Sequence, residues 1–567
     1  MATLADLPTE LLLLIFQRIS TDAILNVGKL CRRLNTVAIP IFLGRLGLSD
    51  PKIRSILTPS HQGYGDALTG LTLHFSMTNI KQLVCILGNN PPRTSIDAIA
   101  SVRSILRIHQ LLNRLSSVDS LSLVLQTVGQ KWTLRSRFVQ EFVIALLSLL
   151  RTALLKSCKS FQIIHSHSMI IDMDYDFQIF NQSTPSMVRN IIRFLARYLP
   201  WKKMDSPRPR GNGWRYQQVP RGQPTQALTM PLVGFQNELT NLDLSSDFLV
   251  IPPFSVWTFD IMEFSRITSF SLSLSHNVTR EEFHSFIFPN IAKKLPQLRE
   301  IRVAFHREDF LATVVENLPC FQFLQKVTIG LPSYGSLPPI STKMTQVTQL
   351  QNLVTFTGSL EQATYFFQPI SCPNLKFINI IIDSYFQATY DHKATVNLFS
   401  SLSKRLSDLG IRPCVSVCLS TNVDPPSPSL TSRTLGEDPE GTEHLSIVSG
   451  LTLELPIFFR NELEVEHQAE HALAWLAVFH RLEKLTVTTR RVIIDIPARE
   501  TRDSTLHRMI TAEYPNLTSF NVVDLLFDEN HYHWSNSRDE LTRGIDGVPT
   551  MTILRSKSTA PCICSHF

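Results

Sequence analysis

The sequence predicts an α/β repeat solenoid that follows a small module of three helices. Short apolar segments of one pattern recur along most of the chain, and between Leu239 and Leu375 they do so at intervals of 22 to 31 residues. The first 42 residues instead have the spacing of amphipathic helices. A chain of 567 residues is also too long for one compact hydrophobic core, so it forms either several domains or a solenoid.

Three short helices are expected at the N-terminus. Apolar residues at positions 11, 12, 15, 16 and 19 mark one face of a first helix, and Pro8 suits its first turn. A second helix is expected after Thr21-Asp22, and a third from about Leu30 to a stop at Pro40. Helices of this length bury little apolar surface by themselves, so the module is expected to complete its core against something else.

The recurring segments have a Leu-x-x-Leu-x-Leu-like pattern, which places two apolar side chains on one face of a short strand. Copies occur at 68–73, 118–123, 158–163, 239–244, 267–272, 298–303, 324–329, 353–356, 375–380, 482–487 and 517–522, with less regular copies near 415–417 and 451–453. A turn with proline precedes several copies, as at Pro296, Pro373 and Pro515, and the stretches between copies have helical spacing. Such a repeat buries its apolar face only against its neighbours.

This pattern resembles leucine-rich-repeat proteins of an irregular, fungal-looking type. The Asn or Cys that such repeats usually have after the strand is mostly missing. The resemblance implies an irregular leucine-rich-repeat horseshoe, with parallel strands on the concave wall and helices on the convex wall. An ordinary α/β sheet domain is the alternative, because leucine-rich strands occur there as well.

The N-terminal module resembles an F-box. The resemblance lies in Leu-Pro-x-Glu-Leu-Leu-x-x-Ile-Phe at 7–16, Ile-Ser-x-Asp at 19–22 and Leu-Cys-Arg-Arg-Leu-Asn at 30–35. The F-box family docks proteins onto the Skp-type adaptor of cullin–RING ubiquitin ligases. For the adaptor-binding surface the resemblance implies Leu7, Pro8, Leu11, Ile15, Leu30 and Cys31.

The two resemblances together imply the substrate-recognition subunit of an SCF-type ubiquitin ligase. The F-box would bind the adaptor and through it a cullin, and the repeats would bind a protein substrate that the sequence does not identify. Residues between the apolar positions would face that substrate, with candidates at Asp243, Ser271, Arg302, Thr328 and Asn379. The alternative is a repeat scaffold without a ligase role, whose N-terminal helices only cap the solenoid.

The expected organisation has five segments. They are an F-box at 1–45, first irregular repeats at 46–200, a basic Pro- and Gly-rich loop or linker at 201–231, a solenoid at 232–534 with a flexible loop at 422–443, and a C-terminal tail at 535–567.

Composition narrows the class of protein. A hydrophobic content of 43% and a charged content of 18% are typical of an ordered globular chain. The net charge of +6 is too mild to imply a nucleic-acid partner, and the longest apolar run, at 142–150, is too short to span a bilayer. Nine scattered cysteines without an export signal indicate reduced thiols, and therefore a cytoplasmic or nuclear protein.

Two further patterns suggest chemistry. His467, Glu470 and His471 fit the His-x-x-Glu-His pattern of inverted zinc peptidases, although acidic neighbours indicate a solvated helix face instead. Cys564 has the frame of a prenylation signal without the aliphatic residues that the transferases prefer. No phosphate-binding glycine loop and no serine nucleophile elbow are present, so no catalysis, cofactor or metal is expected.

Overall fold

The computed structural model of the chain divides into two compact units, Met1–Arg299 with Phe305–Phe321, and Glu300–Ala304 with Gln322–Phe567. The structure describes residues 4–59, 65–87, 95–125, 132–133, 137–165, 171–172, 175–181, 214–220, 238–245, 249–274, 278–305, 309–330, 348–382, 392–419, 442–455, 478–479, 481–492, 519–528, 533–543 and 549–554.

The first unit begins with the predicted small helical module. It consists of the 3-10 helix η1 (Leu4–Asp6) and the helices α1 (Thr9–Arg18), α2 (Thr21–Gly28) and α3 (Arg32–Arg45). The prediction that the third helix stops at Pro40 is wrong, because α3 continues to Arg45. Pro40 is exposed, so the carbonyl that its ring leaves unpaired can be hydrated, while the buried side chains of Phe42 and Leu43 hold the following turn in place.

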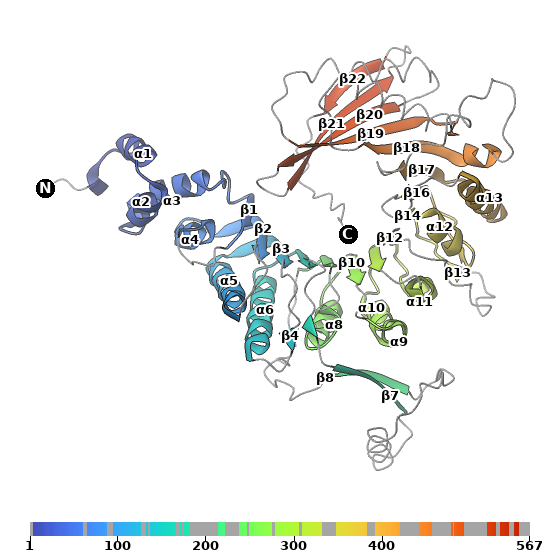
Figure 1. The fold of residues 1–567 in the computed structure, drawn as a ribbon, viewed down its shortest axis with the longest axis horizontal. Helices are drawn as coiled ribbons and strands as arrows, with labels where there is room; N and C mark the ends of the chain where they lie inside the picture. The colour runs from blue at the N-terminus through green and yellow to red at the C-terminus, as the bar shows by residue number, and fades with distance from the viewer. Residues whose placement is uncertain are drawn as a thin grey trace. The chain divides into compact units, whose positions relative to one another are not determined.

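A parallel sheet with helices follows in the same unit. Its strands pair in chain order, as β1 (Arg54–Leu57), β2 (Asn79–Leu87), β3 (Ser117–Leu125), β5 (Ser160–His165), β9 (Asn241–Ser245) and β10 (Ser269–Leu274). The helical segments are α4 (Ala67–Leu73), α5 (Ser95–Arg114), α6 (Arg137–Leu155), α8 (Ser255–Phe264), α9 (Arg280–Glu282), the π-helical η4 (Phe283–Ile287), α10 (Phe288–Lys294), α11 (Asp309–Asn317) and η5 (Leu318–Cys320). Figure 1 shows α4, α5 and α6 side by side along β1, β2 and β3.

The second unit also has a parallel sheet whose strands pair in chain order. These strands are β11 (Glu300–Phe305), β12 (Lys326–Gly330), β14 (Thr355–Gly358), β16 (Phe377–Ile382), β17 (Cys414–Leu419), β18 (Val448–Leu455), β19 (Lys484–Val492) and β20 (Ser519–Asp528). Its other elements are α12 (Leu360–Phe366), α13 (His392–Asp408), η6 (Thr442–Ile447), and the short strands β13 (Thr348–Gln349) and β15 (Ile370–Ser371), which pair with each other.

The apolar positions of the repeated pattern form the buried layer of each sheet. In the first unit Leu121, Phe161, Leu242 and Phe270 are register partners on successive strands, and all are buried. The equivalent row in the second unit includes Ile301, Val327, Phe356, Ile378 and Val415. Twelve of the predicted copies lie in strands of the two units.

The first predicted copy, at 68–73, is the exception and is wrong as a strand. These residues form helix α4, because the Asp66 carboxylate accepts a hydrogen bond from the Thr69 amide at 2.9 Å and so caps the helix. Two strands that the pattern did not predict, β1 and β2, form this end of the sheet instead.

Three helix ends are capped by a cation that lies in the next helix or directly after it. Arg114 of α5 donates to the carbonyl of His74 after α4 at 3.3 Å, and Lys156 after α6 donates to that of Asn113 in α5 at 3.2 Å. In the second unit Arg405 of α13 donates to two carbonyls after α12, at 2.8 and 2.6 Å. These contacts satisfy carbonyls that have no partner inside their own helix, and they join each helix to its predecessor.

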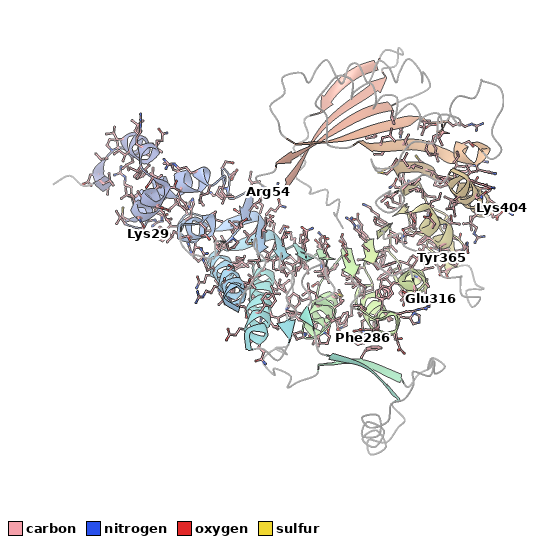
Figure 2. The ribbon with its side chains drawn as sticks, viewed as in Figure 1. Lys29, Arg54, Phe286, Glu316, Tyr365 and Lys404 are labelled. Atoms are coloured by element: carbon pink, nitrogen blue, oxygen red, sulfur yellow. The ribbon has the colours of Figure 1, made fainter. Side chains whose placement is uncertain are left out.

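Two predicted irregular segments contain strands. Within 201–231 the described residues form β8 (Trp214–Pro220), which pairs antiparallel with β7 (Tyr175–Asn181), so this part is not the predicted loop. The ring of Phe177 in β7 meets that of Phe286 edge-on at 6.3 Å, and Figure 2 labels Phe286 beside this hairpin. Pairing with β7 satisfies backbone groups that a loop would leave to water.

The predicted C-terminal tail contains strands as well. β21 (His533–Arg543) pairs antiparallel with β20, and β22 (Pro549–Leu554) pairs antiparallel with β21, so the boundary expected at 534 falls inside a strand. The remainder of 201–231, residues 422–441 of the predicted loop, and 555–567 lie outside the described residues, while 442–443 begin η6.

The remaining short strands, β4 (Trp132–Thr133) and β6 (Ile171–Asp172), form a pair of their own. No helix in the described part of the chain is both long enough and apolar enough to cross a membrane.

Candidate functional site

Helix α1 exposes most of its apolar side chains. Of its ten residues only Leu12 and Phe16 are buried, while Leu11, Leu14 and Ile15 are 46%, 59% and 37% exposed. These three lie three and four positions apart and therefore share one face of the helix, which we call the apolar α1 face. An exposed apolar face on so short a helix is typical of a surface that binds another molecule.

The other predicted adaptor-binding residues lie in different environments. Leu7 is half-buried, and Pro8 is exposed at the N-cap of α1. Leu30, in the turn between α2 and α3, is 70% exposed and follows Lys29, which Figure 2 labels. Cys31 is half-buried at the N-cap of α3.

Sequence reasoning missed Leu14 on the apolar α1 face and Leu13 beside it, which is 39% exposed. The signal was present, because four consecutive leucines at 11–14 are more than the single buried face of a surface helix needs.

The helical module is joined to α4 through Asn35, which is 1% exposed. Its Nδ2 donates to the carbonyls of Gly28 and Leu73, both at 2.9 Å, and its Oδ1 accepts from the amide of Phe75 at 3.2 Å. One buried side chain therefore connects the end of α2 with the end of α4. Gly70 of α4 also packs closely on α3, so the module and α4 form one packed structure.

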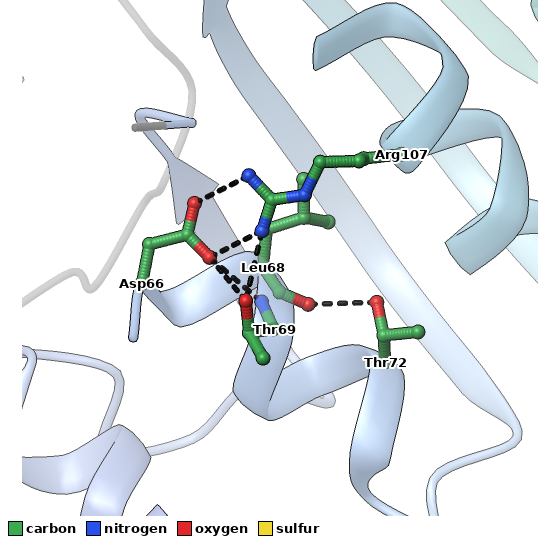
Figure 3. Close-up of polar contacts among 5 residues, drawn as sticks. All are labelled: Asp66, Leu68, Thr69, Thr72 and Arg107. Carbon is green, nitrogen blue, oxygen red and sulfur yellow. Dashed lines mark hydrogen bonds and ion pairs between the residues drawn. The ribbon is translucent and has the colours of Figure 1, made fainter. Parts of the chain in front are cut away.

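An ion pair continues this connection from α4 to α5 (Figure 3). The two Nη atoms of Arg107 lie 2.6 and 2.9 Å from the Oδ atoms of Asp66, and Nη2 also donates to Thr69 Oγ1 at 2.8 Å. Both side chains are largely buried, at 20% and 10% exposure. The carboxylate therefore both caps α4 and binds the neighbouring helix.

The predicted substrate-facing residues lie on the sheet faces opposite the buried layer. In the first unit Asp243 and Ser271 are register partners, and the Asp243 carboxylate accepts from Gln162 Nε2 at 3.1 Å and Ser245 Oγ at 3.0 Å. Gln162 is a neighbour that the sequence did not single out, although it occupies the same position in its own copy of the pattern.

In the second unit Arg302 and Thr328 are register partners, and Arg302 is exposed. Asn379 donates to Thr357 Oγ1 at 3.2 Å and accepts from Ser416 Oγ at 2.7 Å. These side chains form a hydrogen-bonded polar row across three adjacent strands.

The cysteines that the structure describes are free thiols, of which Cys85, Cys158 and Cys372 are buried. Burial raises the pKa of Cys158 and of Cys372 to about 12, and it raises the pKa of Cys85 as well, so all three stay protonated at neutral pH. Within the described ranges no three His, Cys, Asp or Glu side chains gather as metal ligands. The 467–471 pattern and Cys564 lie outside those ranges.

Comparison with known proteins identifies the helical module. Residues 4–43 match a family model described as F-box-like, which spans η1 to α3 and includes the apolar α1 face. A search of curated proteins finds no match to the chain. The chain therefore carries an F-box-like domain at its N-terminus, followed by mainly parallel β-strands with helices.

Proposed function

We propose that this protein is a non-catalytic substrate-recognition subunit of an SCF-type cullin–RING ubiquitin ligase. F-box domains generally bind Skp-type adaptors, and residues 4–43 match that family. The observation that carries the proposal is the apolar α1 face, whose exposed leucine and isoleucine side chains would be removed from water by an adaptor. Within such a ligase the chain acts by proximity, since it holds a substrate close to the activated ubiquitin in the cytosol or nucleus.

Each of the two units is proposed to consist of irregular leucine-rich-repeat-like repeats, and these repeats are proposed to receive the substrate. Three observations support this reading: the strands of each unit pair in chain order, the repeated apolar positions are register partners, and cations cap the preceding helix. Each of these contacts joins one repeat to its neighbour, as in solenoids. The polar rows of Asp243 and Asn379 are the proposed substrate-facing surfaces.

The adaptor-binding role is tested with the full chain and a purified Skp-type adaptor. We expect the double variant Leu11→Glu/Ile15→Glu to bind the adaptor at least one hundredfold more weakly, because both carboxylates would be desolvated on binding. Leu106→Glu on α5 is the matched control, since Leu106 is a leucine of similar exposure, 43%, outside the F-box-like domain. If the double variant bound the adaptor as tightly as the unmodified chain, or if the unmodified chain did not bind it, the scaffold without a ligase role would be favoured instead.

Deleting residues 1–45 is a poor way to separate these two functions. Helix α4 packs on α3 through Gly70, and Asn35 satisfies the Leu73 carbonyl at the end of α4. The deletion would expose this surface of α4 whether residues 1–45 bind an adaptor or only cap the repeats. Substitutions of exposed residues on the apolar α1 face therefore separate the two functions better.

A further inference from the structure

We propose that Arg33 and Arg45 of α3 are positioning residues, which clamp the two ends of α1 and thereby fix the orientation of the apolar α1 face for the adaptor. The inference rests on the proposed adaptor-binding role of that face. Both arginines bind main-chain carbonyls and neither belongs to the apolar surface itself.

Arg45 holds the C-terminal end of α1. Its Nη1 donates to the carbonyl of Ile19 at 2.7 Å, and its Nη2 donates to those of Phe16 and Gln17 at 2.8 and 2.9 Å. Carbonyls in the last turn of a helix have no partner inside the helix, and they form the negative end of its dipole. One guanidinium therefore satisfies three acceptors and places a positive charge where the dipole favours it.

Arg33 holds the segment that leads into α1. Its Nη1 donates to the carbonyl of Ala5 at 2.6 Å, and its Nη2 donates to that of Leu7 at 2.7 Å. The rigid fork of donors in a guanidinium suits two acceptors at once, whereas an ammonium has no such fork. Leu7 lies directly before the Pro8 N-cap, so this contact holds the backbone at the start of α1.

The two arginines match the length of the helix that they hold. They lie twelve positions apart on α3, which is roughly 18 Å along a helix, whereas the ten residues of α1 span about 15 Å. The N-terminal arginine binds the start of α1 and the C-terminal arginine binds its end, so α1 and α3 run in the same direction with a clamp at each end.

The clamps matter because apolar packing alone defines the rotation of α1 weakly. Only Leu12 and Phe16 anchor the helix by full burial, whereas Leu11, Leu14 and Ile15 stay partly exposed. A helix with apolar side chains on two sides gains free energy by rolling so that more of them are buried. Hydrogen bonds at both ends oppose this roll and keep the apolar α1 face available to a partner.

The test uses the full chain and a purified Skp-type adaptor, with binding and amide hydrogen exchange measured on the same samples. We expect Arg45→Gln and Arg33→Gln each to weaken adaptor binding about tenfold and to speed exchange of the α1 amides in the free protein. Arg45→Lys keeps the charge without the fork and should weaken binding several-fold. Arg32→Gln, which removes the same charge at the adjacent exposed position, is the matched control and should bind as the unmodified chain does.

Two results would overturn the inference: Arg33→Gln and Arg45→Gln binding as tightly as the unmodified chain, or weakening no greater than that of Arg32→Gln. Faster exchange of α1 with unchanged binding would count against it as well, because the clamps would then be purely structural. Failure of the adaptor-binding role itself would appear separately, as unchanged binding by the Leu11→Glu/Ile15→Glu variant.

Discussion

Replacing Gly70 by alanine tests whether α3 of the F-box-like domain packs directly against α4. A Cβ atom at this position of α4 would lie 2.7 Å from Cε1 and 2.8 Å from Cδ1 of Phe42, and 2.8 Å from Cδ2 of Leu43. Both neighbours are fully buried on α3, so neither has room to move aside. Overpacking of this kind costs about 1–3 kcal/mol. The helical preference of alanine over glycine returns about 0.5–1 kcal/mol, which leaves a net loss of about 0.5–2 kcal/mol.

Gly44→Ala in α3 is the matched control for this prediction. A Cβ at Gly44 would have no heavy atom within 4 Å, so only the helical preference acts and the variant should be more stable by about 0.5–1 kcal/mol. Native-state hydrogen exchange of the α3 and α4 amides measures both effects in the intact chain. A loss of stability in Gly70→Ala together with a gain in Gly44→Ala would support direct packing of α4 on α3. A Gly70→Ala protein as stable as Gly44→Ala would refute the reasoning, because α4 would then not press against α3.

Three further outcomes are expected. Asn35→Ala leaves two carbonyls and one amide unsatisfied in a buried position, so the free energy of unfolding should fall by about 2–4 kcal/mol in a denaturant titration of the first unit. Arg405→Gln removes the cap on α12 and should speed amide exchange at the end of that helix several-fold, whereas the exposed neighbour Lys404→Gln should not. Burial lowers the pKa of His74, with help from nearby cations, and lowers the pKa of His109. The unfolded chain then binds protons more readily than the folded chain, so the free energy of unfolding falls as the pH drops below about 6.5. The double variant His74→Gln/His109→Gln should reduce this dependence on pH in thermal melts from about pH 7 to 5.5.

The joint between the F-box-like domain and α4 has a consequence for the proposed ligase. Asn35, Gly70 and the Asp66–Arg107 pair form consecutive contacts from α3 through α4 to α5. Motion of α1 to α3 against α4 would break the hydrogen bonds of the buried Asn35 side chain, so an adaptor bound to α1 would be linked to α4 and α5 as well.

The repeated strands were predictable because their signal is local. An apolar residue at every second position indicates a half-buried strand from neighbouring residues alone, and Phe161, Leu242 and Phe270 occupy the expected buried positions. The same reasoning failed at 68–73, where Leu68 and Leu71 also suit one face of a helix. An apolar pattern of six residues fits both structures, and here the Asp66 cap and the contact with α3 favoured the helix.

By itself, then, the sequence determined the kind of protein: three N-terminal helices with an F-box pattern, followed by strands and helices in alternation. Tertiary structure decided what short-range rules leave open. It carried α3 through Pro40 because Phe42 and Leu43 are buried beyond it, and it left the leucines of α1 exposed. Exposure and helix ends depend on which partners the folded chain brings together, such as Arg45 at the end of α1, and those partners are distant in the sequence.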